Sequence, residues 1–198
     1  MRGLIILAIV ISAVVCQKPT PCTTPKQWEA RYFEYDNTKN EETRARISYD
    51  AQYQRERVIE EYILGTADNY YDILYLHSQK IQYVYDLKAK TCTKQTIDRK
   101  WRDFGIPQNA TSLGESYIGS SAIPNAGVLT TIWTDKFTDD KGNQYNYLGV
   151  WTYEGCLPVH LVISSQSGGV DRHVNFFDIT PGIENPNVFT PRPECLNL

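Results

Sequence analysis

Apolar and polar side chains alternate with a period of two residues along most of this chain, and helical periodicity is weak throughout. The run from Tyr145 to Tyr153 is the clearest case, because Tyr147 and Trp151 share its aromatic face. Tyrosine is frequent, with 14 residues, whereas the one methionine is residue 1. Alternation of this kind is typical of strands that bury one face. The sequence therefore predicts an all-β fold with minor α content.

Turn signals divide the alternating segments into roughly nine to eleven strands. The alternating segments are 28–35, 44–50, 57–64, 72–76, 80–87, 128–135, 145–153, 157–165 and 170–179. A short helix or turn is expected near 98–104, and an ordered loop is expected from Pro181 onwards. Regular short strands predict an antiparallel sandwich or an open barrel in one domain.

The first residues have the pattern of a secretory signal peptide. Arg2 precedes an apolar run over residues 4–15, which is too short for a transmembrane helix of roughly 20 residues. Cleavage after Cys16 divides the chain into a signal peptide (1–16) and one domain (17–198). Cleavage after Ala13 is the alternative. No later segment is long and apolar enough to predict a transmembrane segment, so we expect a secreted, extracellular protein.

The cysteines support the cut after Cys16, because four then remain: Cys22, Cys92, Cys156 and Cys195. An even number in an oxidising compartment predicts two disulfides. Their wide spacing, with no Cys-x-x-Cys pair, argues against a zinc or redox site. Four cysteines allow three connectivities, and spacing alone leaves all three open.

Charge and motifs exclude several function classes. The formal net charge of −3 gives no basic surface for nucleic acid. The three histidines, His77, His160 and His173, belong to no metalloprotease pattern, and no Gly-x-Ser-x-Gly elbow is present. A Ser-His-Asp triad can be assembled from distant positions, so a hydrolase stays a remote alternative. The prediction is a protein that is not an enzyme.

Two surface features are expected. Asn109-Ala110-Thr111 is an N-glycosylation sequon, which predicts a glycan at Asn109 on an exposed loop. The acidic pairs Glu41-Glu42, Glu60-Glu61 and Asp139-Asp140 are candidate calcium ligands, but calcium needs six to eight converging oxygens. Each pair is equally compatible with a solvated turn or sheet face, so the metal ligands remain unknown.

Trp133 and Trp151 lie on neighbouring predicted strands and have two interpretations. They pack as a core between two sheets, or they line a ligand pocket. Gly149 lies among large side chains on the same face, which slightly favours the pocket, because a glycine in a strand leaves room for another group.

Several short signatures occur in an order that resembles the ependymin-related family of secreted glycoproteins. The matching pieces are Pro21-Cys22 with Gln27-Trp28-Glu29, Ile47-Ser48-Tyr49-Asp50, Arg55 to Ile59, Tyr83 to Cys92, Ile106 to Thr111, Cys156-Leu157-Pro158-Val159, Phe176 to Ile179, and Val188-Phe189-Thr190-Pro191. No single piece is specific to the family, but the eight pieces in this order are. The resemblance covers nearly all of the mature chain.

The resemblance implies two stacked antiparallel sheets that form an open half-barrel with a central hydrophobic pocket, similar to bacterial lipoprotein carriers. It also implies that Cys22 pairs with Cys156, and Cys92 with Cys195. Family members are extracellular or lysosomal glycoproteins, often dimeric, associated with calcium and cell-matrix adhesion, and suspected of carrying lipids. The same properties are expected here, with Ca²⁺ as the one candidate cofactor.

The leading functional hypothesis is a secreted carrier of a lipid, fatty acid or other hydrophobic small molecule. Inward faces of central strands provide the expected pocket residues: Tyr83, Trp133, Tyr147, Trp151, Leu161 and Phe177. Burying an acyl chain gains about 0.8 kcal/mol per CH₂, so such a site needs no catalytic group. The alternative is an extracellular-matrix or adhesion protein that acts through its surface, its glycan and calcium.

Overall fold

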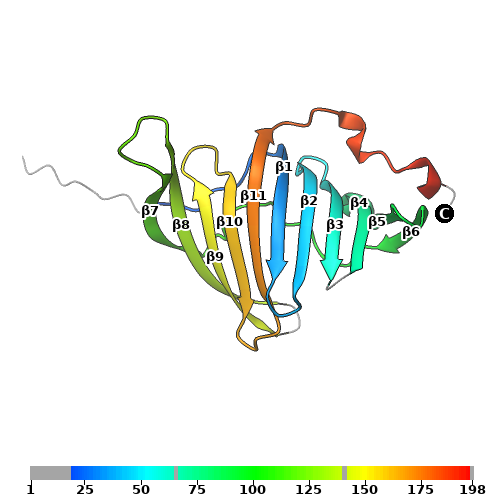
Figure 1. Ribbon diagram of the computed structural model, residues 1–198, viewed down its shortest axis with the longest axis horizontal. Coiled ribbons are helices and arrows are strands. Elements are labelled where there is room, and N and C mark those ends of the chain that lie inside the picture. The colour runs from blue at the N-terminus through cyan, green and yellow to red at the C-terminus, as the bar shows by residue number, and fades with distance from the viewer. Residues whose placement is uncertain (1–18, 65–66, 140–141, 197–198) are drawn as a thin grey trace, which may run out of the picture.

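The computed structural model describes residues 19–64, 67–139 and 142–196, and its strands form one antiparallel sheet (Figure 1). The predicted signal peptide (1–16) and Asp140 lie outside the described residues. The strands are β1 (Gln27–Asp36), β2 (Glu41–Asp50), β3 (Arg55–Leu64), β4 (Ala67–Leu76), β5 (Ile81–Asp86), β6 (Thr91–Thr96), β7 (Thr111–Gly119), β8 (Gly127–Thr138), β9 (Gln144–Thr152), β10 (Pro158–Ser165) and β11 (Asp171–Pro181).

Two meanders make up the sheet, in the order β6-β5-β4-β3-β2-β1-β11-β10-β9-β8-β7. They join where β1 pairs with β11, with Tyr32 opposite Phe176 and Glu34 opposite Val174. The expected open, all-β half-barrel is confirmed. The two sheets expected from the resemblance are joined into one curved sheet, because the pairing of β1 with β11 makes the hydrogen bonding continuous.

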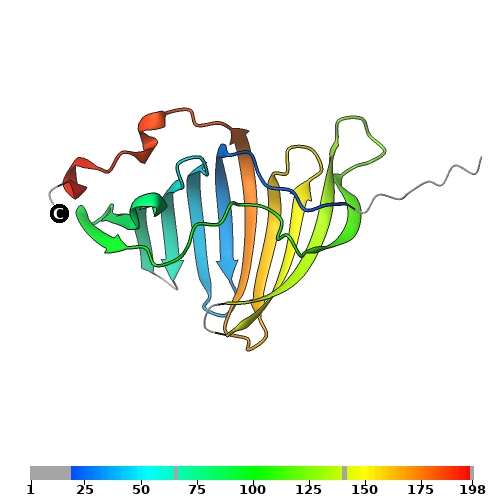
Figure 2. The same cartoon turned by 180° about the vertical axis from the view of Figure 1, so that it is seen from behind.

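The segment 97–110 crosses the concave face of the sheet, as Figure 2 shows. A helix or turn was expected over 98–104, but this stretch is extended and irregular. Its contacts explain why: the Phe104 amide donates to the Tyr49 hydroxyl at 2.8 Å, and Trp101 stacks on Tyr49. Gly105 runs against residues 22–23, where a Cβ would lie 2.8 Å from the Cys22 carbonyl oxygen. Tertiary contacts therefore hold this segment flat against the sheet.

A filled core lies where the crossing segment meets β8, β9 and β10. Trp133 and Trp151 are each 1% exposed, and Ile106 and Ala110 pack against them from the segment. A second cluster surrounds Trp28, which is fully buried against Tyr49 and Phe104. These two clusters seal the half of the concave face that carries β8–β10 and the end of the sheet near Trp28.

The C-terminal tail covers the opposite, convex face. It contains the 3₁₀ helices η2 (Pro186–Phe189) and η3 (Pro193–Cys195), and Phe189 packs on Leu74 and Leu76. Arg57 and Arg192 both bind the carboxylate of Asp72, which is 3% exposed. The ordered tail expected from Pro181 is thus held by apolar and ionic contacts.

Candidate ligand-binding site

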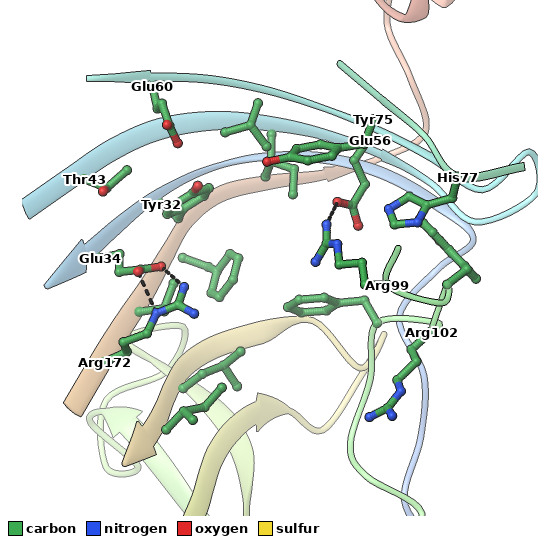
Figure 3. Close-up of a pocket in the computed structure, with 18 of the residues that line it drawn as sticks. Tyr32, Glu34, Thr43, Glu56, Glu60, Tyr75, His77, Arg99, Arg102 and Arg172 are labelled. Atoms are coloured by element: carbon green, nitrogen blue, oxygen red, sulfur yellow. Dashed lines mark hydrogen bonds and ion pairs between the residues drawn. The ribbon is translucent and has the colours of Figure 1, made fainter. Parts of the chain in front are cut away.

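A cavity of about 830 Å³ opens on the concave face, in the half of the sheet that the filled core does not occupy (Figure 3). Volumes of this order are typical of small-molecule sites. Strands β1–β4, β10 and β11 and the crossing segment supply its walls. The lining residues are Tyr32, Glu34, Thr43, Ile47, Glu56, Val58, Glu60, Tyr62, Tyr75, His77, Arg99, Lys100, Trp101, Arg102, Phe104, Leu161, Ile163, Arg172, Val174 and Phe176.

Strand alternation brings these side chains to one face. Glu56, Val58, Glu60 and Tyr62 are every second residue of β3, so all four point into the cavity while the residues between them point to the convex face. The small side chain of Ala45 lies opposite Glu60 on β3 and opposite Tyr32 on β1. A small residue between two long ones leaves the floor of the cavity open.

Part of the cavity lining is apolar, and it is interspersed with charged side chains. Ile47, Val58, Leu161, Val174 and Phe176 contribute aliphatic and aromatic surface from several strands. Such a surface gains free energy when an apolar ligand displaces water from it, at roughly 25 cal/mol per Å² of buried area. The wall is therefore suited to an alkyl chain or a ring system.

Charged side chains also line the cavity, so the expected hydrophobic pocket is only partly apolar. The Arg172 guanidinium donates to both carboxylate oxygens of Glu34, at 2.7 and 2.6 Å, and this bidentate pair is largely self-neutralising. Arg99 from the crossing segment lies 3.4 Å from Glu56. Burial raises the pKa of Glu56, and the Arg99 guanidinium opposes the shift.

Glu60 differs from the other two carboxylates of the cavity. Within the described part of the chain, no Lys, Arg or His nitrogen lies within salt-bridge distance of it. Burial, reinforced by the nearby charge of Glu34, raises the pKa of Glu60. Burial also raises the pKa of Tyr32, so a phenol that keeps its proton faces this carboxylate across the floor.

His77 lies at the other end of the cavity, in η1 (His77–Gln79). Its ring is close to parallel with Tyr75 and meets Trp101 edge-on, and only 8% of the residue is exposed. Nε2 of His77 is buried with no hydrogen-bond partner. Burial and the Arg99 guanidinium lower the pKa of His77, against the effect of the Arg99 backbone, and the lowered pKa favours the neutral ring.

Three of the expected pocket residues belong to the filled core instead. Trp133, Tyr147 and Trp151 are 1%, 6% and 1% exposed, and the Trp151 indole donates to the Tyr147 hydroxyl at 2.7 Å. Gly149 does not open space for a ligand, because a Cβ there would overlap the Tyr147 hydroxyl and the Trp151 indole. The two side chains themselves fill the room that glycine leaves.

Two further residues lie on the other face of the sheet. Phe177 is 50% exposed, and its neighbour Phe176 is the one that points into the cavity. Tyr83 packs on the convex side with Leu74 and Phe189, under the tail. Leu161 is the one expected pocket residue that lines the cavity.

The disulfides join Cys22 to Cys156 and Cys92 to Cys195, which are the pairs that the family resemblance implied. The first fixes the segment before β1 to the β9–β10 turn, and the second fixes the tail to β6. Asn109 is exposed in a turn that follows Pro107, where a glycan is accessible to solvent. Its occupancy stays a prediction.

The acidic pairs do not converge in the structure. Glu60 points into the cavity, whereas Glu61 accepts from Tyr70 and lies near Arg44 on the convex face. Among the described residues, no group of three His, Cys, Asp or Glu side chains is arranged to hold a metal. Calcium binding therefore stays an expectation from the resemblance, without assigned ligands.

The histidines offer no hydrolytic arrangement in the described ranges. His160 contacts Asn175 and His173 contacts Asp171, both on the convex face. No histidine of the described ranges hydrogen-bonds to a serine hydroxyl. The helices of the same ranges are all too short or too polar to cross a membrane.

Most of this cavity was not predicted from the sequence. Glu60 was considered only as half of an acidic pair, and Tyr32, Glu34 and Arg172 were not singled out. A signal was present, because β3 places carboxylates and Val58 on the same face. Carboxylates on an otherwise apolar strand face indicate either a solvated face or a polar ligand site, and only the position of the crossing segment separates the two.

Comparison with known proteins relates the chain to the ependymins. The Ependymin family model matches residues 65–195. Mammalian ependymin-related protein 1 of Mus musculus is 31% identical over 178 residues, which cover 89% of this chain and 77% of the mouse protein. Ependymin of Clupea harengus is 25% identical over 198 residues, covering 98% and 91% of the two chains.

A solved structure shares the fold. An uncharacterized conserved protein from Thermus thermophilus superposes with a TM-score of 0.54, over 86% of this chain and 87% of the bacterial chain. Its sequence identity is 12%, so the likeness concerns the fold alone.

Proposed function

The chain belongs to the ependymin family, and we propose that it is an extracellular carrier that shelters an apolar or amphipathic small molecule on the concave face of its sheet. The observation that carries this proposal is the cavity of about 830 Å³ between the sheet and residues 99–104. The sheet and the crossing segment form its walls, and part of the lining is apolar. A lipid tail laid there leaves water without any catalytic group.

Two disulfides support the extracellular part of the proposal. Structural disulfides persist in oxidising compartments and are rare in the cytosol. Each bridge here joins elements that are distant in the chain, at separations of 134 and 103. A glycan at Asn109 and secretion through the predicted signal peptide belong to the same proposal.

Native mass spectrometry of the protein secreted by a eukaryotic host tests the carrier function. We expect a bound species that denaturation releases as a small hydrophobic molecule. The matched variants Val58→Trp and Ile59→Trp sharpen the test. Val58 lines the cavity, whereas its neighbour Ile59 is 41% exposed on the convex face. A bulky ring should displace the ligand at position 58 and leave it at position 59.

Equal occupancy in both folded variants, or no bound molecule together with no uptake of an uncharged fluorescent probe such as N-phenyl-1-naphthylamine, would contradict the proposal. Circular dichroism establishes that each variant is folded, because overpacking costs about 1–3 kcal/mol. A variant that unfolds is replaced by the smaller change Val58→Phe, which is compared with Ile59→Phe.

The end of the sheet formed by β7 and β8 favours a second function, association with other proteins. This hairpin exposes several large apolar side chains: Leu113, Tyr117, Ile118, Ile123 and Val128. Exposed apolar patches are typical of interaction surfaces, so we propose a dimer or matrix contact through this hairpin. Sedimentation of the glycosylated protein with and without calcium tests it. A monomer at every micromolar concentration would refute the dimer.

A further inference from the structure

The cavity contains one carboxylate that the protein does not neutralise, and this feature deepens the proposed function on which it rests. Glu34 is paired with Arg172, and Glu56 lies near Arg99. Outside the cavity floor, Glu41 lies 3.5 Å from Lys39. Glu60 alone among the cavity carboxylates of the described chain has no cation within salt-bridge distance.

The surroundings make an unpaired charge at Glu60 costly. Glu60 is partly buried, and Val58 and Ile47 lie beside it on the lining. The charge of Glu34 adds to the negative potential there. A partly buried carboxylate is stabilised by proton uptake or by a cation brought from outside. Glu60 is thus a candidate binding site for a cationic group. The apolar side chains of Val58 and Ile47 lie next to it, so the same ligand can place an apolar chain against them.

A second, independent observation also indicates a ligand. His77 is 8% exposed, and its Nε2 atom is buried without a partner. Figure 3 shows its ring directed into the cavity, at the end away from Glu60. Buried polar atoms in native proteins are almost always hydrogen-bonded. A polar group of a ligand held at this end of the cavity would give this nitrogen the partner that the described residues do not supply.

The rim of the cavity has the opposite charge, but its influence is weaker. Arg99, Lys100 and Arg102 lie on the crossing segment and are exposed. Exposed charges act through water and are screened by salt within about 10 Å, whereas a charge on the partly buried floor acts through a lower effective dielectric constant. For a head group that enters the cavity, the carboxylate of Glu60 has the larger effect.

We propose that the cavity binds an amphiphile that carries a protonated amine, with the ammonium group at Glu60 and the apolar chain along Val58, Ile47 and Phe176. The hydroxyl of Tyr32 faces the same space from β1. Ala45, between Tyr32 and Glu60 on the floor, leaves room for the head group. The ligand cation completes a charge pair of the kind that Arg172 already provides for Glu34.

Three probes of equal chain length test this assignment: dodecylamine, dodecanol and dodecanoic acid. Each is used below its micelle-forming concentration to displace N-phenyl-1-naphthylamine from the full-length secreted protein at pH 7. We expect dodecylamine to bind at least about tenfold more tightly than dodecanol, a ratio that corresponds to about 1.4 kcal/mol. Glu60→Gln should reduce that ratio to about one and leave the affinity for dodecanol unchanged.

Glu61→Gln is the matched control, because Glu61 is the next residue and points to the convex face. It should keep the preference for the amine. A wild-type protein that binds dodecanol or dodecanoic acid as tightly as dodecylamine would overturn the inference, as would a preference that survives Glu60→Gln. Either result leaves the carrier function intact, provided that the uncharged probe binds. If the probe fails to bind and native mass spectrometry detects neither a co-purified molecule nor any of the three dodecyl compounds, both this inference and the proposed carrier function are overturned.

Discussion

The two halves of the sheet solve the same packing problem differently. In the half formed by β8, β9 and β10, Trp133 and Trp151 project from the concave face and meet Ile106 from the crossing segment, which leaves no space. In the half formed by β1–β4, the corresponding positions carry smaller or charged side chains such as Ala45 and Glu60. The crossing segment spans both halves, but it closes only one of them.

This difference shows that the side chains, and not the course of the backbone, decide where the cavity lies. The crossing segment presents Ile106 and Ala110 to the filled half. It presents Arg99, Lys100 and Arg102 at the open half, and these cannot be buried without partners. The open half therefore keeps solvent-accessible space on its concave face and depends on its convex face for stability.

The largest effect expected is from the Cys22–Cys156 disulfide, which ties the segment before β1 to the filled half. The double change Cys22→Ser with Cys156→Ser opens a loop with a sequence separation of 134. In the chain-entropy model this lowers the free energy of unfolding by about 5 kcal/mol. Urea denaturation of the purified variant measures it. A loss below about 1 kcal/mol, a small fraction of that model value, would show that packing alone holds the filled half together.

A core truncation should separate the halves directly. Trp133→Ala removes a side chain that is 1% exposed, so it should lower the free energy of unfolding by about 3–5 kcal/mol. Ile47→Ala, on the cavity wall in β2, should cost only about 1 kcal/mol, because Ile47 is partly exposed there. Similar losses in the two variants, measured by urea denaturation, would erase the distinction between a filled and an open half.

The third test concerns the ion pairs that hold the C-terminal tail on the convex face of the open half. Asp72→Asn leaves Arg57 and Arg192 without their shared carboxylate. Removing one partner of a buried ionic pair typically costs about 3–5 kcal/mol, and the partial exposure of Arg192 favours the lower end. The thermal unfolding temperature should fall, and proteolysis should cleave the tail at residues 181–192 more rapidly, which a reducing gel detects because Cys195 stays bonded to Cys92. An unchanged cleavage rate would show that Phe189 and this disulfide suffice as anchors of the tail.

The smallest effect expected concerns pH. Burial alone would raise the pKa of Asp72, but hydrogen bonds from Arg57 and Arg192 lower it, so its stabilisation is present above the unfolded value of about 3.9 and is lost as pH falls through the folded value. The raised pKa of Glu60 has the opposite sign: its stabilisation is present below the unfolded value of about 4.3 and is lost as pH rises through the folded value.

Glu60→Gln should therefore stabilise the ligand-free protein slightly at pH 7, and the gain should vanish as pH is lowered through the raised pKa of Glu60. Denaturation midpoints in urea at pH 7 and pH 4 measure this difference, with Glu61→Gln as the control on the other face. A loss of stability at pH 7 would mean that Glu60 has a cationic partner in the folded protein.

The sequence predicted the fold better than the site, for identifiable reasons. Strands with one buried face were found from their alternation, whereas β6 (Thr91–Thr96) and β7 (Thr111–Gly119) were missed because most of their side chains are exposed. Alternation also placed Trp133 and Trp151 on the concave face. It could not show that the crossing segment covers that part of the face, since this depends on contacts of Phe104 and Trp101 with distant strands.

The remaining errors in the expected pocket concern which face of a strand a residue occupies. Phe176 and Phe177 are adjacent, and a shift of one residue exchanges the two faces of a strand. Tyr83 follows the expected alternation of β5, but the face it shares with Tyr85 is the one that the tail covers. Neither choice can be made without knowing which side of the sheet the tail occupies.

The pairing of β1 with β11 also has a consequence for the order of folding. Among the described strands, every other neighbouring pair is consecutive in the chain, so each meander can form from local hairpins. Closing β1 onto β11 brings together residues such as Tyr32 and Phe176, and pairings this distant in sequence slow folding. Because both residues line the cavity, a ligand that spans them binds the joined sheet and neither meander alone. By mass action, such a ligand raises the melting temperature of the joined sheet.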